Sequence, residues 1–198
     1  MDTHCKNKAI TRFIILVPHR DTVRILDEYR KKLFGIGFNG AYSFPSSAVL
    51  AEVSQPFGRD ELKELATNIR RLTLKNDGKI QTTGPIALSF PISLTMEASF
   101  FGLPLAISPL KEEFQEIIPP TAAKKIINIT FPPALCVALT NSSFNTKEKT
   151  NPPYTPTLSF RAAFVANLSL RPLRVPEDVL SFQWRIGTPT WLPSPARS

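Results

Sequence analysis

Short apolar runs, several of them bounded by proline, alternate with amphipathic segments along this chain. The first run, residues 12–18, is β-branched and ends at a proline, which is typical of a central strand. Asp21 can cap the amphipathic segment that follows, and Gly35 and Gly37 can end it, so a helix is predicted there. A second helix is predicted from Asp60. Strand-like and helix-like periods in alternation predict a mixed α+β domain.

Each predicted helix has an apolar face and a basic face. In the first helix the apolar positions Val23, Ile25, Leu26, Tyr29 and Leu33 mostly share one face, and in the second Leu62, Leu65, Ile69 and Leu72 are expected to point inward. The outward basic positions are Arg24, Arg30, Lys31 and Lys32, and Arg59, Lys63, Arg70, Arg71 and Lys75. We interpret these charges first as solvated helix faces.

Two proline-led apolar runs, residues 44–51 and 131–138, resemble each other. Both begin with Phe-Pro, and Ser46 and Ala134, the first residues after the prolines, are 88 positions apart. A strand and a helix are predicted before each run. We therefore predict a weak internal duplication, in which two β-α-β arrangements place their inner strands at a central groove.

The inner strands are expected at about residues 46–53 and 134–140, each preceded by its prolines. Asn76-Asp77-Gly78 predicts a turn. Pro104 indicates an edge position or a bulge, and Trp191 is expected to pack on the sheet. The other expected elements are a strand over 79–90 with a hairpin partner over 99–107, a short helix over 108–118, and strands over 157–170 and 180–186.

The whole chain, residues 1–198, is predicted to form a single domain. Its apolar fraction of 42% is sufficient for a hydrophobic core. Three polar segments are expected to lie outside that core: a loose N-terminus over 1–10, an exposed loop over 141–156 and a tail over 193–198.

The net charge of +8 makes an anionic partner a hypothesis, with RNA or a nucleotide phosphate as the first candidates. Simple solubility is the alternative explanation. Cys5 and Cys136 are too few for a disulfide framework and favour a reducing compartment such as the cytoplasm. No apolar run approaches the roughly 18 residues of a membrane helix, so no membrane partner is expected. A monomer is expected, and a protein partner is kept open.

From about residue 12 to 192, the order of elements resembles the two-histidine (2H) phosphoesterase family, which includes RNA 2′-5′ ligase-like proteins and cyclic phosphodiesterases. The resemblance rests on the opening strand 13–18, on Leu50-Ala51-Glu52-Val53 leading into residues 60–65, on the hairpin over 84–107 and on the closing strands. It implies a two-lobed α+β domain with a groove at its centre.

The family's signature is His-x-Thr/Ser on each inner strand. In this chain, the positions equivalent to that signature contain no histidine. The equivalent positions read Ser46-Ser47-Ala48 and Ala134-Leu135-Cys136. Neither the shifted register Ser47-Ala48-Val49 nor Thr155-Pro156-Thr157 as a second motif supplies one. The degenerate motif positions are therefore Ser46, Ala48, Ala134 and Cys136, and Ser46 and Ser47 are the candidates for phosphate contact.

In the family, one histidine takes a proton from the attacking oxygen and the other protonates the leaving oxygen, a task that suits a pKa near neutrality. The only histidines here, His4 and His19, lie outside both runs. Catalysis by the usual residues is therefore not expected. The sequence also has no glycine-rich phosphate loop, no zinc motif and no serine-hydrolase elbow, so neither a metal nor a cofactor is expected.

Three hypotheses for function remain. The first is a catalytically degenerate 2H phosphoesterase-like protein that binds a nucleotide or RNA phosphate in its groove. The second is a structural or protein-interaction domain whose groove is filled by side chains. The third is an active cyclic phosphodiesterase or RNA 2′-5′ ligase-like enzyme with replaced catalytic residues.

Overall fold

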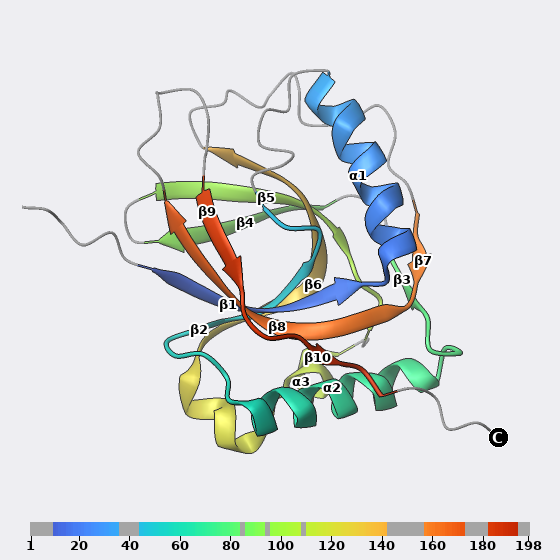
Figure 1. The fold of residues 1–198 in the computed structure, drawn as a ribbon, viewed down its shortest axis with the longest axis vertical. Coiled ribbons are helices and arrows are strands. Elements are labelled where there is room, and N and C mark those ends of the chain that lie inside the picture. The colour runs from blue at the N-terminus through green and yellow to red at the C-terminus, as the bar shows by residue number, and fades with distance from the viewer. Residues whose placement is uncertain are drawn as a thin grey trace, which may run out of the picture.

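The computed structural model describes residues 10–35, 44–83, 86–93, 96–107, 110–141, 157–172 and 182–193. These residues form a mixed α+β fold, in which helices pack on a large antiparallel sheet (Figure 1). The expected α+β class is confirmed. Most of the segments 1–10, 141–156 and 193–198, together with Gly37 and the predicted helix start at Ser108-Pro109, lie outside the described residues.

The described elements fall into one large sheet, one small sheet and four helical segments. The large sheet contains β1 (Thr11–Pro18), β2 (Ala48–Val53), β4 (Ile86–Ser93), β5 (Met96–Pro104), β6 (Ile126–Asn141), β8 (Ala162–Pro172), β9 (Phe182–Ile186) and β10 (Thr190–Trp191). The small sheet pairs β3 (Ile80–Gln81) with β7 (Ser159–Phe160). The helices are α1 (Arg20–Gly35), α2 (Arg59–Leu74), α3 (Lys111–Gln115) and the 3-10 helix η2 (Pro120–Lys125).

The strand order of the large sheet is β10-β8-β1-β2-β6-β5-β4, with β9 also pairing with β8, and every pair is antiparallel. The two predicted inner strands, β2 and β6, are direct neighbours in this sheet. Ala48 lies opposite Leu135, and Val49 lies opposite Ala134. Figure 1 shows α1 at the upper right and α2 along the bottom, beneath β8 and β10.

Strand β1 has apolar residues on both of its faces. Ile14 and Leu16 belong to the larger core, which also takes residues from α1 and α2. Phe13 and Ile15 belong to a smaller core on the other face. Since successive side chains of a strand point to opposite faces, a strand covered on both sides is apolar throughout. This explains why the continuous run over 12–18 correctly predicted a central strand.

The helix predictions are largely confirmed. In α1, Leu26, Tyr29 and Leu33 are buried and Val23 is partly buried, whereas Ile25 is 46% exposed, so most of the predicted apolar positions share the packed face and Ile25 is the exception. In α2, the predicted residues Leu62, Leu65 and Ile69 are buried and Leu72 is partly buried. The apolar spacing located both helices because their packing faces follow the 3.6-residue period.

The second inner strand is much longer than predicted. β6 begins at Ile126, so Phe131-Pro132-Pro133 lies inside it and not before it. The partner of β2 changes from Ala134 at Val49 to Ile129 at Ala51, and the prolines fall within this irregularity. Proline has no N–H for the ladder and is tolerated in a strand where the pairing is interrupted. The sequence pattern showed the prolines but not the bulge that accommodates them.

Several strands are also divided differently from the prediction. The segment over 79–90 is split into β3 and β4, which belong to different sheets, and the segment over 157–170 is split into β7 and β8. The predicted hairpin is confirmed as β4 and β5. β5 lies between β4 and β6, so Pro104 is not on an edge strand; it is the last residue of β5.

Three further predictions can be compared with the structure. The helix expected over 108–118 is shorter, as α3 covers Lys111–Gln115. The strand expected over 180–186 is confirmed as β9. Trp191 contacts the sheet through an edge-to-face arrangement with Phe164, whose ring centroid lies 5.2 Å away, while 66% of Trp191 stays exposed.

The first turn of α2 is joined to the end of η2, just before β6, through Glu61. Its Oε2 accepts hydrogen bonds from Gly58 N, at 2.5 Å, and from Lys125 Nζ, at 2.7 Å. Burial alone would raise the pKa of the Glu61 carboxyl, but these hydrogen bonds and the charge of Lys125 lower that pKa below its usual value. The ionised Glu61 carboxylate therefore stabilises the fold at a pH above its ordinary pKa. This stabilisation is lost as the pH falls through the lowered pKa of the folded state.

The predicted turn at Asn76-Asp77-Gly78 is confirmed and follows α2 directly. Asp77 and Gly78 both have a positive φ, of 53° and 71°. Gly78 N donates to Thr73 O at 2.9 Å, which closes the end of the helix. The turn places Gly78 against the guanidinium of Arg70, because a Cβ added at Gly78 would lie 2.6 Å from Arg70 Nη1.

Replacing Gly78 by alanine is expected to lower the free energy of unfolding by about 1–2 kcal/mol, since a side chain in the left-handed region is strained. The matched control is Gly35→Ala, because an added Cβ there meets no atom within 4 Å. The control should not destabilise the fold, as alanine favours helices over glycine. Urea unfolding measures both variants, and equal midpoints for the two would contradict the prediction.

Candidate functional site

Ser46, which the sequence predicted as a degenerate motif position, lies just before β2 and contacts α1. Its Oγ donates a hydrogen bond to Asp27 Oδ1 at 2.7 Å and accepts one from Arg30 Nη1 at 2.8 Å. The neighbouring Ser47 is fully buried, and its Oγ donates to Pro45 O at 3.2 Å. Both serine hydroxyls that were candidates for phosphate contact therefore have partners within the protein.

Arg30 connects α1 to both inner strands. It is only 2% exposed, although the sequence had placed it on the outer face of the helix, and that prediction was wrong. Its Nη2 donates to Pro45 O and to Cys136 O. The carboxylate of Asp27, whose side chain is 48% exposed, lies 3.9 Å from Nη1 and supplies a counter-charge. The guanidinium thus joins the start of β2 to the middle of β6.

The helical spacing already contained the signal for this inward position. Arg30 is four residues after Leu26 and three before Leu33, so it belongs to the stripe of buried residues. The charge of arginine favoured an outward assignment, because arginine is seldom fully buried unless it is paired. Its pairing depends on backbone carbonyls of distant segments, which the sequence pattern does not reveal.

The other motif positions belong to the apolar interior. Ala48 is fully buried, Ala134 is 6% exposed and Cys136 is 2% exposed. Burial raises the pKa of the Cys136 thiol to about 12, although the nearby charge of Arg30 acts in the opposite direction. The smaller core around Cys136 includes Phe44, which packs edge-to-face on Phe13 with ring centroids 6.3 Å apart.

This arrangement contains no acid–base pair suited to phosphoester cleavage. A carboxylate such as Asp27 is a much weaker base than a serine alkoxide, so the Ser46–Asp27 hydrogen bond alone does not activate the hydroxyl. The histidine within the described residues, His19, is at the start of α1 and its Nδ1 lies 3.1 Å from Asp21 Oδ2. The Ser46–Asp27–Arg30 network therefore functions as a structural connection between α1 and the sheet.

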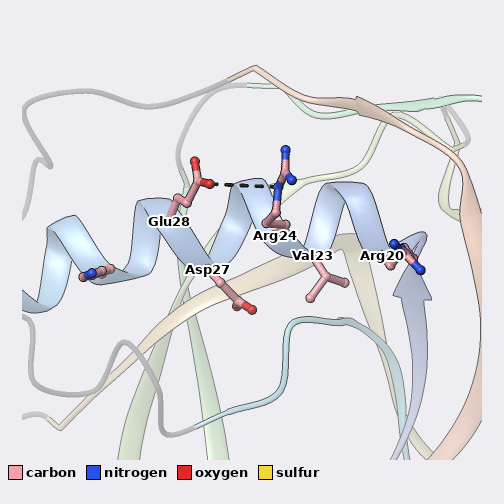
Figure 2. Close-up of a pocket in the computed structure, with 6 residues that line it drawn as sticks. Arg20, Val23, Arg24, Asp27 and Glu28 are labelled. Atoms are coloured by element: carbon pink, nitrogen blue, oxygen red, sulfur yellow. Dashed lines mark ion pairs between the residues drawn. The ribbon is translucent and has the colours of Figure 1, made fainter.

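A shallow hollow of about 380 Å³ lies on α1 beside this network (Figure 2). Figure 2 shows Asp27 and Val23 pointing to one side of the helix and Arg24 and Glu28 to the other. Arg24 Nε and Glu28 Oε1 lie 4.0 Å apart, which is the pair drawn with a dashed line. The lining residues are Arg20, Val23, Arg24, Asp27, Glu28 and Lys31. Asp27 thus connects the buried motif position to a surface with three cationic side chains.

In the part of the chain that the structure describes, no three His, Cys, Asp or Glu side chains gather closely enough to hold a metal ion. No helix within the same residues is long and apolar enough to cross a membrane. Comparisons of the chain with protein-family models, with curated proteins and with solved structures gave no match.

Proposed function

We propose that this chain is a catalytically degenerate 2H phosphoesterase-like protein that binds a phosphate-bearing ligand, a nucleotide or an RNA, without cleaving it. The observation that carries the proposal is the chemistry of the motif positions. They hold Ser46, Ala48, Ala134 and Cys136, and the Arg30 guanidinium lies among them. None of these groups exchanges a proton near neutral pH, as the reaction requires.

The proposal includes a two-lobed arrangement built from two β-α-β halves. The antiparallel pairing of β2 with β6 near the middle of the sheet supports it, because the two motif-bearing strands are then neighbours. The preceding elements also agree in order, since β1 and α1 come before β2, and β5 and α3 come before β6.

The ligand part of the proposal is supported by charge. The net charge is +8, and the cationic side chains of Arg20, Arg24 and Lys31 outnumber the carboxylates of Asp27 and Glu28 in the lining of the hollow. Guanidinium and ammonium groups are the usual partners of phosphate oxygens. The hollow is therefore the place where we propose that the phosphate binds, since the motif positions Ala48, Ala134 and Cys136 are buried.

Titration calorimetry with a 2′,3′-cyclic mononucleotide and with a short RNA tests this function when the products in the same samples are also analysed. We expect binding that weakens with salt, because phosphate contacts release counterions, and no product above the buffer control. Lys31→Gln should weaken binding more than Lys32→Gln, because both remove one charge from α1 but only Lys31 lines the hollow.

Two outcomes would contradict the proposal. The first is turnover that disappears when a residue lining the hollow or a motif position is substituted, because it would show that other residues replace the histidines and that the protein is an enzyme. Absence of binding to both ligands at low salt would favour the structural or protein-interaction alternative. That alternative has one observation in its favour, since Arg30 and the apolar core around Phe44 already surround the motif positions.

A further inference from the structure

A second cavity, of about 410 Å³, lies away from the motif strands, where the end of α2 meets the start of β8 and the segment after β10. Figure 1 shows the chain leaving β10 as it passes over α2. The residues that line the cavity are His19, Arg70, Leu74, Asp77, Arg161, Ala162, Leu192 and Pro193. They come from distant parts of the sequence, and none of them belongs to the predicted motif.

Two arginines, Arg70 and Arg161, line this cavity. Neither the Arg70 nor the Arg161 side chain makes a hydrogen bond or an ion pair within the described part of the chain, and the Nε of Arg70 is buried. A buried polar group without a partner is unfavourable, and more so when it is charged. Arg70 is held in place by its packing against Gly78. The sequence had placed Arg70 on a solvated helix face, but the structure buries part of it.

The third basic residue, His19, makes two contacts. Its backbone N donates to Arg161 O at 2.8 Å, which joins the start of α1 to the residue before β8. Its Nδ1 lies 3.1 Å from Asp21 Oδ2, so the imidazole lies beside a carboxylate. The cavity therefore combines an imidazole with two guanidinium groups that have no partner within the described part of the chain.

The remaining wall is mainly apolar, with Leu74, Ala162, Leu192 and Pro193. A small cavity with an apolar wall and a few polar groups is typical of small-molecule sites, and 410 Å³ lies within their usual range of about 300–1,000 Å³. Two guanidinium groups favour a doubly charged phosphate, since each can donate two parallel hydrogen bonds to it. Asp77 opposes an anion, but the two arginines outnumber it.

We propose that this cavity binds a small organic phosphomonoester, with the terminal phosphate between Arg70 and Arg161 and the organic part against the apolar wall. The site is independent of the function proposed above, because it shares no residue with the Ser46–Asp27–Arg30 network or with the hollow on α1.

The test is a calorimetric titration of the full chain with adenosine monophosphate, inorganic phosphate and adenosine. Adenosine monophosphate should bind most tightly, since it alone offers both a terminal phosphate and an organic part. Arg70→Gln and Arg161→Gln should each weaken its binding about tenfold or more, because each removes hydrogen bonds to a charged group. Arg71→Gln is the matched control: it removes the same charge from the next residue of α2, which does not line the cavity.

Asp77→Asn provides a change in the opposite direction. It removes the only carboxylate that lines the cavity within the described residues, and asparagine tolerates the φ of 53° at this position. Binding of adenosine monophosphate should therefore become tighter, by about threefold or more at low salt. If Arg70→Gln proves unstable in thermal unfolding, Arg161→Gln still tests the site, because Arg161 is exposed.

Four outcomes would overturn the proposal. The first two are that adenosine monophosphate does not bind, or that adenosine binds equally tightly. The third is that neither Arg70→Gln nor Arg161→Gln weakens the binding of adenosine monophosphate. The fourth is that only Lys31→Gln weakens it, which would place the ligand in the hollow on α1. Competition against adenosine monophosphate distinguishes two sources of the terminal phosphate. If an RNA end supplies it, a short RNA with a 5′-phosphate should compete better than the same RNA with a 5′-hydroxyl. If neither RNA competes and only free nucleotides do, the ligand is a small molecule; either pattern supports the phosphomonoester site.

Discussion

Replacing Arg30 by methionine is expected to lower the free energy of unfolding by about 3 kcal/mol, because breaking a buried charged network leaves its partners unsatisfied. The variant removes the donor for Ser46 Oγ, Pro45 O and Cys136 O and the counter-charge of Asp27. Methionine keeps the unbranched apolar stem, so lost packing contributes little. Urea unfolding followed by circular dichroism measures the change.

Arg24→Met is the control for the Arg30 experiment. It makes the same replacement on the same helix, but the Arg24 side chain is 82% exposed and only forms a surface pair with Glu28. Its effect should stay below about 1 kcal/mol, as is usual for exposed ion pairs. Arg30→Lys should fall between the two, since lysine keeps the charge but cannot reach three acceptors with one planar group. Equal unfolding midpoints for Arg30→Met and Arg24→Met would contradict the structural role of the network.

The Cys136 thiol is expected to react with an aromatic disulfide reagent at least about a thousandfold more slowly in the folded protein than in the unfolded chain at about pH 8. Thiolate is the reactive form, and burial raises the pKa of this thiol to about 12. The thiolate fraction at that pH is therefore about three powers of ten below that of an ordinary cysteine, and burial also blocks the reagent. The release of the coloured thiol measures the rate.

This measurement requires the background Cys5→Ser, so that Cys136 is the only thiol. Adding Cys136→Ala to that background should abolish the signal, and concentrated guanidinium chloride should restore rapid reaction when Cys136 is present. A folded rate close to the unfolded rate would show that the motif strand opens to solvent. The same pKa shift also affects stability, because the folded state favours the neutral Cys136 thiol. This stabilisation is fully present below the ordinary thiol pKa near 9 and is lost as the pH rises toward 12.

Together, the two experiments ask whether the degenerate motif positions form a rigid part of the interior. If Arg30 is required for stability and Cys136 is inaccessible, the motif strands serve the fold, and ligand contacts must come from surfaces outside them. The hollow on α1 and the cavity around Arg70 and Arg161 are the two such surfaces proposed above. Substitutions at Lys31 and at Arg161 separate them, because each residue lines only one.

The elements that the sequence predicted well are those whose signal is local. The buried strand over 12–18 and the two long helices each follow from apolar spacing within a short window. The turn at Asn76-Asp77-Gly78 follows from residue types that tolerate a positive φ. In all these cases, neighbouring residues in the chain determine the conformation.

The predictions that failed concern contacts between distant segments. The prolines at 132 and 133 looked like a strand boundary, because their placement in β6 depends on a bulge opposite β2. The segment over 79–90 looked continuous, because only pairing decides that β3 joins β7 and β4 joins β5. Strand pairing is a non-local choice that a single strand's pattern does not contain.

By itself, the sequence determined the α+β class, the positions of the main helices and the absence of histidine from both motif-like runs, since these depend on local periodicity and residue identity. Only the tertiary structure decided which carbonyl groups Arg30 binds in the interior and that Arg70 and Arg161 line one cavity with His19. The physical reason is that the partners of a charged side chain come from segments far away in the chain. Residue type shows what arginine can bind, and the fold determines what lies within its reach.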